Sequence, residues 1–301
     1  MKPKNEPRIK QKDSRYKNRK TLDYDNRKTE LKLFTWNVRS LNEPRALQRL
    51  AEILSTYKAD ITAIQEVRWL GRGIVDRRDY TFYYGGDTKD KMFGTGFLVT
   101  GVMRQHIIDF NVVDKRISTL RCRGKFFNIT IINCHAPTEE KSDEEKESFY
   151  DLLSRTYDKC PKHDIKIVIG DMNAQIGKED IYRPVIGKHS LHDTSNDNGT
   201  KLIDFSASKN LVIGSTRFQH KRIHKATWIH PNGSTRNQID HVLVDGRHIG
   251  NLQDVRSFRG ANIDSDHFLV GSSLKYRISN YRKSKPVRTA DRINVEETKN
   301  P

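Results

Sequence analysis

The chain of 301 residues carries 55 Lys and Arg against 38 Asp and Glu, which gives a net charge of +17 and a pI of about 9.7. Because 35% of the residues are hydrophobic and 31% are charged, the core has to be concentrated in part of the chain. The basic surplus favours a polyanionic partner, with nucleic acid first and an anionic membrane second. Non-enzymatic ribosomal and chromatin proteins share this balance.

The cysteines and the hydropathy pattern exclude further classes. Cys122, Cys134 and Cys160 form no CxxC pair, which argues against a zinc site or a disulfide framework and for a reducing intracellular compartment. Cys122 and Cys134 lie in strand-like runs and are expected in the core. No run of about 18 apolar residues occurs, so we expect no membrane span, and the charged N-terminus predicts no signal peptide.

Both ends of the chain are polar and basic. Residues 1–30 carry many Lys and Arg and few aliphatic side chains, so they are predicted to form a disordered basic arm. This arm could serve nuclear import, grip phosphates, or be a solvated tail with no specific role. Residues 277–301 are predicted to be a second disordered basic tail. The folded domain is expected over residues 31–276.

Strands outnumber helices in the predicted domain, and no internal repeat is present. Apolar and alternating runs predict strands at 31–36, 60–65, 80–84, 96–100, 117–121, 126–134, 165–169, 226–230, 239–244 and 268–274. Apolar residues at helical spacing predict helices at 43–57, 144–157 and 201–208. This order points to an α/β sandwich with mixed sheets rather than a purely parallel, doubly wound fold.

The stretch from Ile165 to Asn173 is the most informative one. Five residues with an apolar, β-branched pattern lead into Gly170, Asp171 and Asn173. A buried strand ends in a carboxylate at a free-energy cost unless that group is paired, hydrogen-bonded or metal-bound. Active sites of α/β proteins lie at such strand ends. The stretch therefore predicts metal-assisted hydrolysis of a phosphate ester with Asp171 at its centre.

Other predicted strands also end or begin at polar side chains, and each has a structural alternative. Asn37 could cap a turn, His135 could belong to a turn, and Asp240 could only start a strand. Glu66 could form a surface ion pair with Arg68. Asp266 and His267 could form an Asx turn. Trp228 is expected to pack in the core, with base stacking as its alternative.

Taken together, these side chains match the needs of phosphodiester hydrolysis. Mg²⁺ prefers oxygen ligands and takes one or two carboxylates from the protein, a role that Glu66 fits. Asn37 and Asn173 can donate to a phosphate or to a neighbouring carboxylate. Asp171 can orient and deprotonate water. His267 can donate to the phosphate if a carboxylate holds its other nitrogen, and Asp240 is the best candidate for that.

Five short motifs follow one another in order along the chain. They are Trp36-Asn37-Val38, Gln65-Glu66-Val67-Arg68, Gly170-Asp171-Met172-Asn173, Ile239-Asp240-His241 and Ser265-Asp266-His267-Phe268. This order resembles the endonuclease/exonuclease/phosphatase superfamily over roughly residues 31–275. The Trp-Asn-Val-Arg start and the stretches 135–141 and 196–202 also resemble the endonuclease domains of non-LTR retrotransposons and the craniofacial development protein 2-like proteins.

The resemblance implies a four-layer α/β sandwich with two mixed sheets packed face to face and helices outside. By that resemblance, Glu66 binds the metal with help from Asn37, and Asp266 lies at the metal or beside it. Asp171 activates water or protonates the leaving group, Asn173 orients the phosphate, and Asp240 pairs with His267. Asn198 falls where related enzymes have a loop near the DNA. Candidate substrate-binding residues are Asn198, Arg68 and Trp228.

Two positions depart from the pattern of many relatives. His135 precedes Ala-Pro where many relatives have a tyrosine, and histidine can both donate and titrate, so a different pH profile is expected. Arg39 stands where abasic-site nucleases often carry an acid, which points away from abasic-site repair. Residues 1–301 contain no reverse transcriptase motif, so we expect an endonuclease-only product, either a domesticated gene, a truncated element or a fragment.

The sequence thus predicts a Mg²⁺-dependent endonuclease, with Mn²⁺ as an alternative ion, that nicks DNA in the manner of retrotransposon enzymes. We expect a nuclear monomer that uses no small-molecule cofactor and no membrane. The first alternative is a phosphatase of the same superfamily that acts on inositol or lipid phosphates. The second is a catalytically silent nucleic-acid-binding relic, against which the intact set of polar residues argues.

Overall fold

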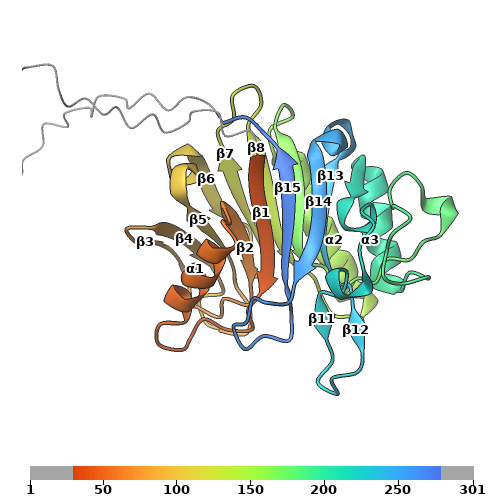
Figure 1. Ribbon diagram of the computed structural model, residues 1–301, viewed down its shortest axis with the longest axis horizontal. Helices are drawn as coiled ribbons and strands as arrows, with labels where there is room; N and C mark the ends of the chain where they lie inside the picture. Colours follow the sequence, from red (N-terminus) through yellow and green to blue (C-terminus); the bar gives the residue numbers. More distant parts are fainter. Residues whose placement is uncertain (1–29, 279–301) are drawn as a thin grey trace, which may run out of the picture.

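The structure, a computed structural model, describes residues 30–278 (Figure 1). Most of the predicted basic arm and tail therefore lies outside the described residues. The boundary residues belong to the fold: Glu30 opens the first strand, the backbone N–H of Lys125 donates to the Arg277 carbonyl at 2.9 Å, and Ile278 forms a β-bridge with Gly124. None of the described helices is long and apolar enough to cross a membrane.

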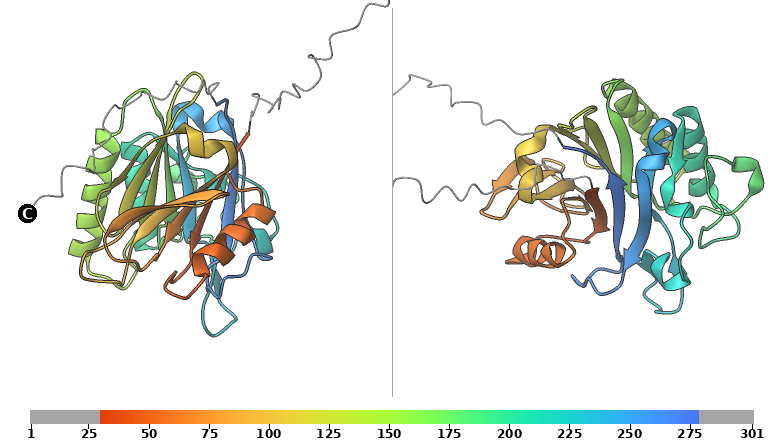
Figure 2. Two further views of the ribbon diagram at one scale, coloured as in Figure 1. Left: turned by 90° about the vertical axis from the view of Figure 1, so that its left-hand side faces the viewer. Right: turned by 45° about the horizontal axis from the view of Figure 1, so that its top comes forward.

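Two large sheets pack face to face (Figure 2). In spatial order, the first sheet contains β14 (Leu252–Phe258), β15 (Leu269–Lys275), β1 (Glu30–Asn37), β2 (Ile61–Gln65), β5 (Thr95–Thr100), β4 (Tyr80–Gly85) and β3 (Arg72–Asp76). The second contains β10 (Leu211–Ile213), β13 (Asp240–Asp245), β9 (Ile165–Asp171), β8 (Ile129–His135), β7 (Ile117–Cys122) and β6 (Ile107–Val112). The pairs β1–β2 and β8–β9 are parallel and the others antiparallel, so both sheets are mixed.

Helices cover the outer faces of the two sheets. α1 (Ala46–Thr56) packs through Leu50 and Leu54 on the first sheet. α2 (Asp143–Lys159) and α3 (Asp197–Ser208) pack on the second. Short 3₁₀ helices lie at Gly101–His106, Asp180–Tyr182, Gly214–Thr216, Arg222–His224 and Gly246–Asn251. The predicted fold class, a four-layer α/β sandwich, is confirmed.

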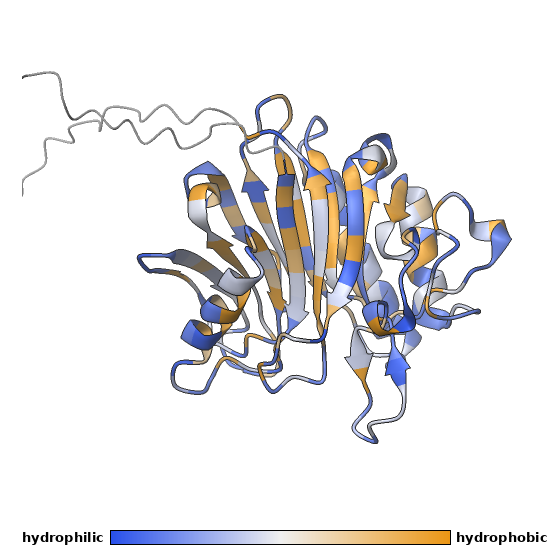
Figure 3. Ribbon diagram, viewed as in Figure 1, coloured by the Kyte–Doolittle hydropathy of each residue, from blue (hydrophilic) through white to orange (hydrophobic). Residues whose placement is uncertain are grey.

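The alternation along the strands decides which side chains lie between the sheets (Figure 3). In β1, Leu31 and Leu33 belong to the core between the sheets, whereas Phe34 and Trp36 pack on the α1 side. In β9, Ile165, Ile167 and Ile169 also face that inner core. Because the strand period is two residues, Asn37 and Asp171 continue the inward-facing series of their strands.

Some predicted element boundaries were wrong. Helix α3 begins at Asp197, four residues before the predicted start, because the Asn196 side chain accepts a hydrogen bond from the Gly199 N–H at 2.8 Å and caps it. The strands β3, β6, β10, β14 and β12 (Arg236–Asn237) were not predicted, and neither was the pairing of β12 with β11 (Trp228–Ile229). Edge position and polar, exposed faces weaken the strand pattern in β3 and β6.

A buried polar network links the two sheets behind the strand ends. The Gln65 amide donates to Asn133 Oδ1 at 2.6 Å, and the Asn133 amide donates to the carbonyls of Ile64 and Gly96 at 2.9 Å each. Buried polar groups stabilise a structure only when they are paired, and these are. All three cysteines are buried and unpaired, so the core prediction for Cys122 and Cys134 is confirmed.

Candidate active site

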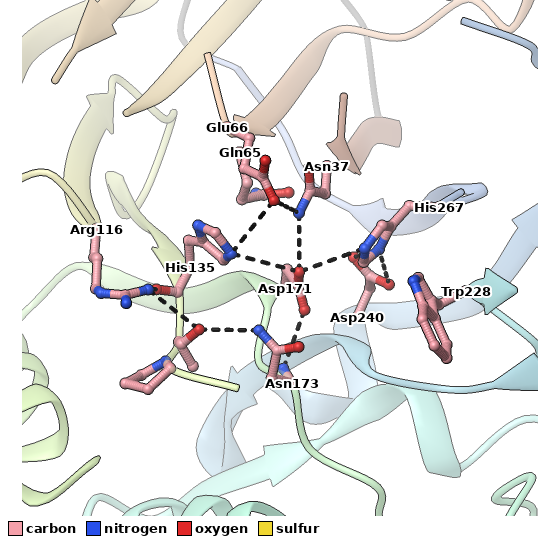
Figure 4. Close-up of polar contacts among 12 residues, drawn as sticks. Asn37, Gln65, Glu66, Arg116, His135, Asp171, Asn173, Trp228, Asp240 and His267 are labelled. Atoms are coloured by element: carbon pink, nitrogen blue, oxygen red, sulfur yellow. Dashed lines mark hydrogen bonds and ion pairs between the residues drawn. The ribbon is translucent and has the colours of Figure 1, made fainter. Parts of the chain in front are cut away.

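Polar side chains from both sheets meet at the carboxyl ends of β1, β2, β8 and β9 (Figure 4). Strand pairing places three of them. His135 lies beside Asp171 in the parallel pair β8–β9, and Asp171 lies opposite Asp240 in the antiparallel pair β9–β13. A cavity of about 560 Å³ opens here, lined among others by Asn37, Glu66, His135, Asp171 and His267.

Asn37 joins the two sheets at this point. Its amide nitrogen donates to Glu66 Oε1 and to Asp171 Oδ2, both at 3.0 Å, while its Oδ1 accepts from the Arg39 N–H. Ser265 Oγ in turn donates to the Asn37 carbonyl at 2.6 Å. Both N–H groups of the Asn37 amide are thus donated to neighbouring carboxylates, which is one of the two uses predicted for this amide.

His267 lies between two carboxylates. Its Nδ1 is 3.1 Å from Asp240 Oδ2, and its Nε2 is 3.7 Å from Asp171 Oδ2. Burial by itself lowers the pKa of His267, but Asp240 and Asp171 outweigh that effect and raise the pKa to about 9. The pairing predicted for Asp240 and His267 is present, and His267 is a cation at neutral pH.

The Asp240 carboxylate is expected to keep His267 charged. Replacing Asp240 by Asn removes the carboxylate nearest His267 and so lowers the pKa of that imidazole from its wild-type value of about 9. NMR titration of the His267 imidazole between pH 5.5 and 10 measures this pKa in both proteins, and an unmoved midpoint in the variant would contradict the role of Asp240.

Burial is the largest influence on the pKa values of Asp171 and His135. Burial raises the pKa of Asp171, although His267 opposes the shift, so this carboxylate holds a proton more readily than an exposed one. Burial lowers the pKa of His135 despite Asp171 and Glu66, each 3.8 Å from its Nε2. The distances alone would suggest ion pairs, but burial of the His135 imidazole favours its neutral form. Its Nδ1 has no hydrogen-bond partner among the described residues.

Glu66 lies at the open side of the cluster. Its Oε2 accepts a hydrogen bond from Arg68 at 2.7 Å, so the ion pair between Glu66 and Arg68 exists. Both residues line the cavity, however, so this ion pair belongs to the site. Burial raises the pKa of Glu66, yet His135, Asn37 and Arg68 together lower it, and the carboxylate is ionised. Because Arg68 pairs only with Oε2, the ionised Glu66 carboxylate can still bind a metal ion.

Strained backbone is concentrated at this cavity. Arg39, Glu66, Arg68 and Asn173 have φ values of 58°, 54°, 58° and 47° and all line it. A positive φ is uncommon for residues with a Cβ and costs free energy, which the surrounding structure has to offset. Such residues gather at functional sites, so the backbone and the side chains indicate the same site.

Asp266 and Trp228 form one wall of the cavity. Trp228 Nε1 donates to Asp266 Oδ2 at 3.1 Å, and the Trp228 ring meets His230 edge-to-face at 5.6 Å. The expected core packing of Trp228 is therefore wrong: its ring is half-buried and lines the cavity. Asp266 Oδ1 makes no hydrogen bond among the described residues. Its nearest cationic atom there is Arg39 Nε, at 3.7 Å.

Asn173 and Asn198 hold the loops below the cavity. The Asn173 amide donates to the Ala136 carbonyl at 2.9 Å, and its backbone N–H donates to Asp171 Oδ1. The Asn198 amide donates to the carbonyls of Pro137 and Asn173. Asn198 is 1% exposed in the first turn of α3, so a direct substrate contact has to be corrected to a positioning role.

Sequence reasoning missed several residues that support the site. Arg116 donates to the His135 carbonyl at 3.1 Å and to Glu145, and its guanidinium lies 4.3 Å from the Phe93 ring. Glu139 accepts from the backbone N–H groups of Asp197 and Asn198. Neither residue follows an apolar run: Arg116 directly precedes β7, and Glu139 lies in the loop after β8. The strand-end pattern therefore did not single them out.

The donor set fits a hard divalent cation. The carboxylates Glu66, Glu139, Glu140, Asp171 and Asp266 line the cavity against Arg39 and Arg68, although the chain as a whole is strongly basic. No described thiol lies among the lining residues. Oxygen-rich, acidic sites of this kind suit Mg²⁺ or Mn²⁺. Asp266 Oδ1, which accepts no hydrogen bond among the described residues, leaves a carboxylate oxygen available to a cation in addition to Arg39.

Asp171, Asp240 and His267 also bring ligand atoms within 4.8 Å of one another. This closeness has a simpler cause, since the imidazole bridges the two carboxylates. A protonated imidazole has no lone pair for a metal. The Glu66 side of the cluster is therefore the better place for the ion.

Comparison with known families decides the class. The model of the endonuclease/exonuclease/phosphatase family matches residues 34–267. The chain belongs to this family. Its members are generally hydrolases that act on phosphodiester bonds. The match spans every site residue from Asn37 to His267, and the resemblance in motif order is confirmed.

Curated relatives of this endonuclease/exonuclease/phosphatase chain agree with the second resemblance. Craniofacial development protein 2 of Tragulus javanicus is 33% identical over 251 residues, covering 83% of this chain and 43% of that protein. The Bos taurus protein of the same name is also 33% identical over 251 residues, with 42% of its length covered. The chain thus spans less than half the length of these relatives.

Solved structures share the fold at low identity. The catalytic domain of Xenopus laevis APE2 superposes with a TM-score of 0.63 at 18% identity, covering 83% of this chain and 94% of that chain. The endonuclease domain of TRAS1, a telomere-specific non-LTR retrotransposon, superposes with a TM-score of 0.57 at 16% identity. The match covers 82% of this chain and 99% of that chain. At these identities the likeness shows the family sandwich fold.

Proposed function

We propose that this protein is a divalent-metal-dependent endonuclease that nicks DNA. The observation that carries the proposal is the cross-sheet cluster in which one amide, Asn37, bonds the Glu66 and Asp171 carboxylates while His267 bridges Asp171 and Asp240. An ionised carboxylate, a buried carboxylate with a raised pKa and a cationic imidazole lie within one cavity. In phosphodiester hydrolysis, groups of these three kinds can hold a metal ion, accept a proton from water and donate to the phosphate.

Glu66 would hold the metal, with Asn37 fixing the Glu66 carboxylate and Asp266 beside it. Nucleases of the family typically use divalent metals, and Mg²⁺ is our first choice, with Mn²⁺ second. When bound, such an ion supplies positive charge that stabilises the phosphoryl oxygens in the transition state.

Side chains of the protein would activate the water molecule and bind the phosphate. Asp171 Oδ2, held by Asn37, orients a water molecule and accepts its proton. The protonated Nε2 of His267 donates to a phosphate oxygen, and Asp240 keeps the imidazole charged. The Asn173 amide, fixed on the Ala136 carbonyl by one N–H, has a second N–H with which it can orient the phosphate. Arg68 and Trp228 line the cavity where the DNA strand would pass.

The charge of the chain favours DNA over a small phosphate ester. Of the net charge of +17, residues 1–29 and 279–301 carry +10, whereas the catalytic cavity is itself acidic. Cations outside the cavity can contact several backbone phosphates, as polymeric nucleic acid requires and a single phosphomonoester does not.

Nicking of supercoiled plasmid tests the proposal. We expect conversion to the relaxed circle with Mg²⁺ and none with EDTA. Protein that binds plasmid but never nicks it would contradict the enzyme proposal and support a silent nucleic-acid-binding relic. Phosphate release from inositol phosphates without plasmid nicking would support the phosphatase alternative. Size-exclusion mass and fluorescence microscopy of tagged protein test the further proposals of a monomer and of nuclear localisation.

Replacing Glu66 by Gln is expected to weaken metal binding. The amide keeps the shape and the contact with Asn37 but loses the negative charge that attracts the ion. The Mg²⁺ concentration for half-maximal nicking should rise at least about tenfold. Calorimetric titration with Mn²⁺ measures the same loss without turnover. Glu147→Gln, at an exposed position on α2, is the matched control and should behave as wild type.

A further inference from the structure

The end of the sandwich opposite the active site exposes two aromatic rings. The loop between β7 and β8 lies at the top of Figure 1, whereas β1 and β2 end at the bottom. On this loop Phe126 is 69% and Phe127 48% exposed. β8 leads from this loop to His135, so at about 3.3 Å per residue this surface lies roughly 25 Å from the active site.

The loop is held firmly in this position. The Lys125 N–H donates to the Arg277 carbonyl at 2.9 Å, and the Tyr276 hydroxyl donates to the Phe127 carbonyl at 3.2 Å. A Cβ at Gly124 would lie 1.9 Å from that carbonyl, so the close approach requires glycine. Tyr276 and Ile278 belong to the buried core. The exposure of the two rings is therefore a fixed feature of the fold.

Cations surround the two rings. Arg123, Lys125, Lys275 and Arg277 are exposed, and within residues 30–278 none of them forms an ion pair. Lys125 Nζ lies 5.3 Å from the centre of the Phe126 ring, and the His248 ring lies 5.7 Å from that of Phe127. A cavity of about 300 Å³ between the loop and β15 is lined by no described carboxylate.

The chain enters and leaves the fold at this same end, because Glu30 and Lys275 are paired residues of β1 and β15. In the sequence, residues 1–29 contain 11 Lys and Arg against 4 Asp and Glu, and residues 279–301 contain 6 against 3. Positive charge is thus concentrated along the chain on both sides of this surface. A polyanion is the partner that this charge fits.

We propose that Phe126 and Phe127, with Lys125, Lys275 and Arg277, form a second nucleic-acid surface that binds a single strand. Exposed aromatic rings stack on unpaired bases, and the neighbouring cations contact the phosphates between them. A duplex does not present its base faces, so the rings select the single-stranded form. DNA and RNA offer the same stacking and phosphate chemistry. This surface is separate from the catalytic cavity and does not depend on nuclease activity.

Fluorescence anisotropy with a 15-nucleotide oligo-dT, a 15-nucleotide oligo-U and a 15-base-pair duplex tests this surface on the full chain. Phe126→Ala/Phe127→Ala should lower the affinity for the single strands at least about tenfold and leave duplex affinity within about twofold. If the variant loses affinity for only one of the two oligonucleotides, that result identifies whether the surface binds DNA or RNA. Lys275→Gln/Arg277→Gln should reduce the salt slope for a single strand by about 1.4.

Ile181→Ala, at an apolar side chain that is 84% exposed elsewhere, is the matched control and should bind as wild type. Unchanged single-strand affinity in both double variants, with wild-type melting temperatures, would overturn the proposal. A dimer mass that Phe126→Ala/Phe127→Ala abolishes would assign the surface to a second copy of the chain and overturn it too. Tighter binding of a labelled acidic peptide than of either oligonucleotide would also overturn it.

Discussion

Asp171→Asn is expected to lower the rate of plasmid nicking by about 10²–10⁴-fold while the protein still binds DNA. The amide keeps the shape of the side chain and can still accept from Asn37, but it cannot take a proton from water. Single-turnover nicking at saturating protein separates the chemical step from binding. DNA affinity, measured by anisotropy in the presence of Ca²⁺, should stay within about threefold of wild type.

The control for this prediction is Asp151→Asn, an exposed carboxylate on α2 that should nick as wild type. Wild-type nicking by Asp171→Asn would remove Asp171 from the mechanism. Parallel loss of nicking, DNA binding and thermal stability would show that this carboxylate is needed for structure, since it also accepts the hydrogen bond that joins the two sheets.

His267→Gln is expected to lower nicking by about 10²–10³-fold, because a neutral amide replaces a cation that donates to the phosphate. It should also destabilise the fold by about 3–5 kcal/mol, because Asp240 is fully buried and loses its charged partner. Chemical denaturation measures the second effect. His163→Gln, at an exposed histidine, is the matched control.

The stability difference should depend on pH in a defined direction. The pKa of His267 is raised from 6.5 to about 9 in the folded state, so its contribution is complete below pH 6.5 and is lost as pH rises through 9. The difference between wild type and His267→Gln should shrink over this interval. A constant difference would mean that His267 stabilises the fold by packing rather than by charge.

Much of the candidate site could be predicted from the chain because of the two-residue period of strands. Asn37 continues the inward series of Leu31 and Leu33, and Asp171 continues that of Ile165 and Ile169. A polar residue that continues the inward-facing positions of a buried apolar strand lies at the end of the core, where a functional site can form. The pairing of Asp240 with His267 was predicted from chemistry, since an imidazole donor needs a second group to hold it.

Other roles needed the folded chain. Asn198 shares the polar character of the site residues, yet helix α3 buries it as a link between two loops. Trp228 was expected in the core because large aromatic residues usually pack there, but the short pair β11–β12 places its ring on the cavity wall. Arg116 and Glu139 follow no apolar run, and only tertiary contacts reveal their roles.

By itself, the sequence determined the family, the mixed α/β sandwich and most of the polar residues that meet at the strand ends, because strand periodicity and motif order are local properties. The tertiary structure alone decided that Asn37 bonds carboxylates from both sheets, that His267 is charged and that His135 is neutral. The hydrogen bond between Asn37 and Asp171 joins residues 134 positions apart, and the charge state of His267 depends on burial and on Asp240, 27 residues away in the chain. No local pattern encodes those distances.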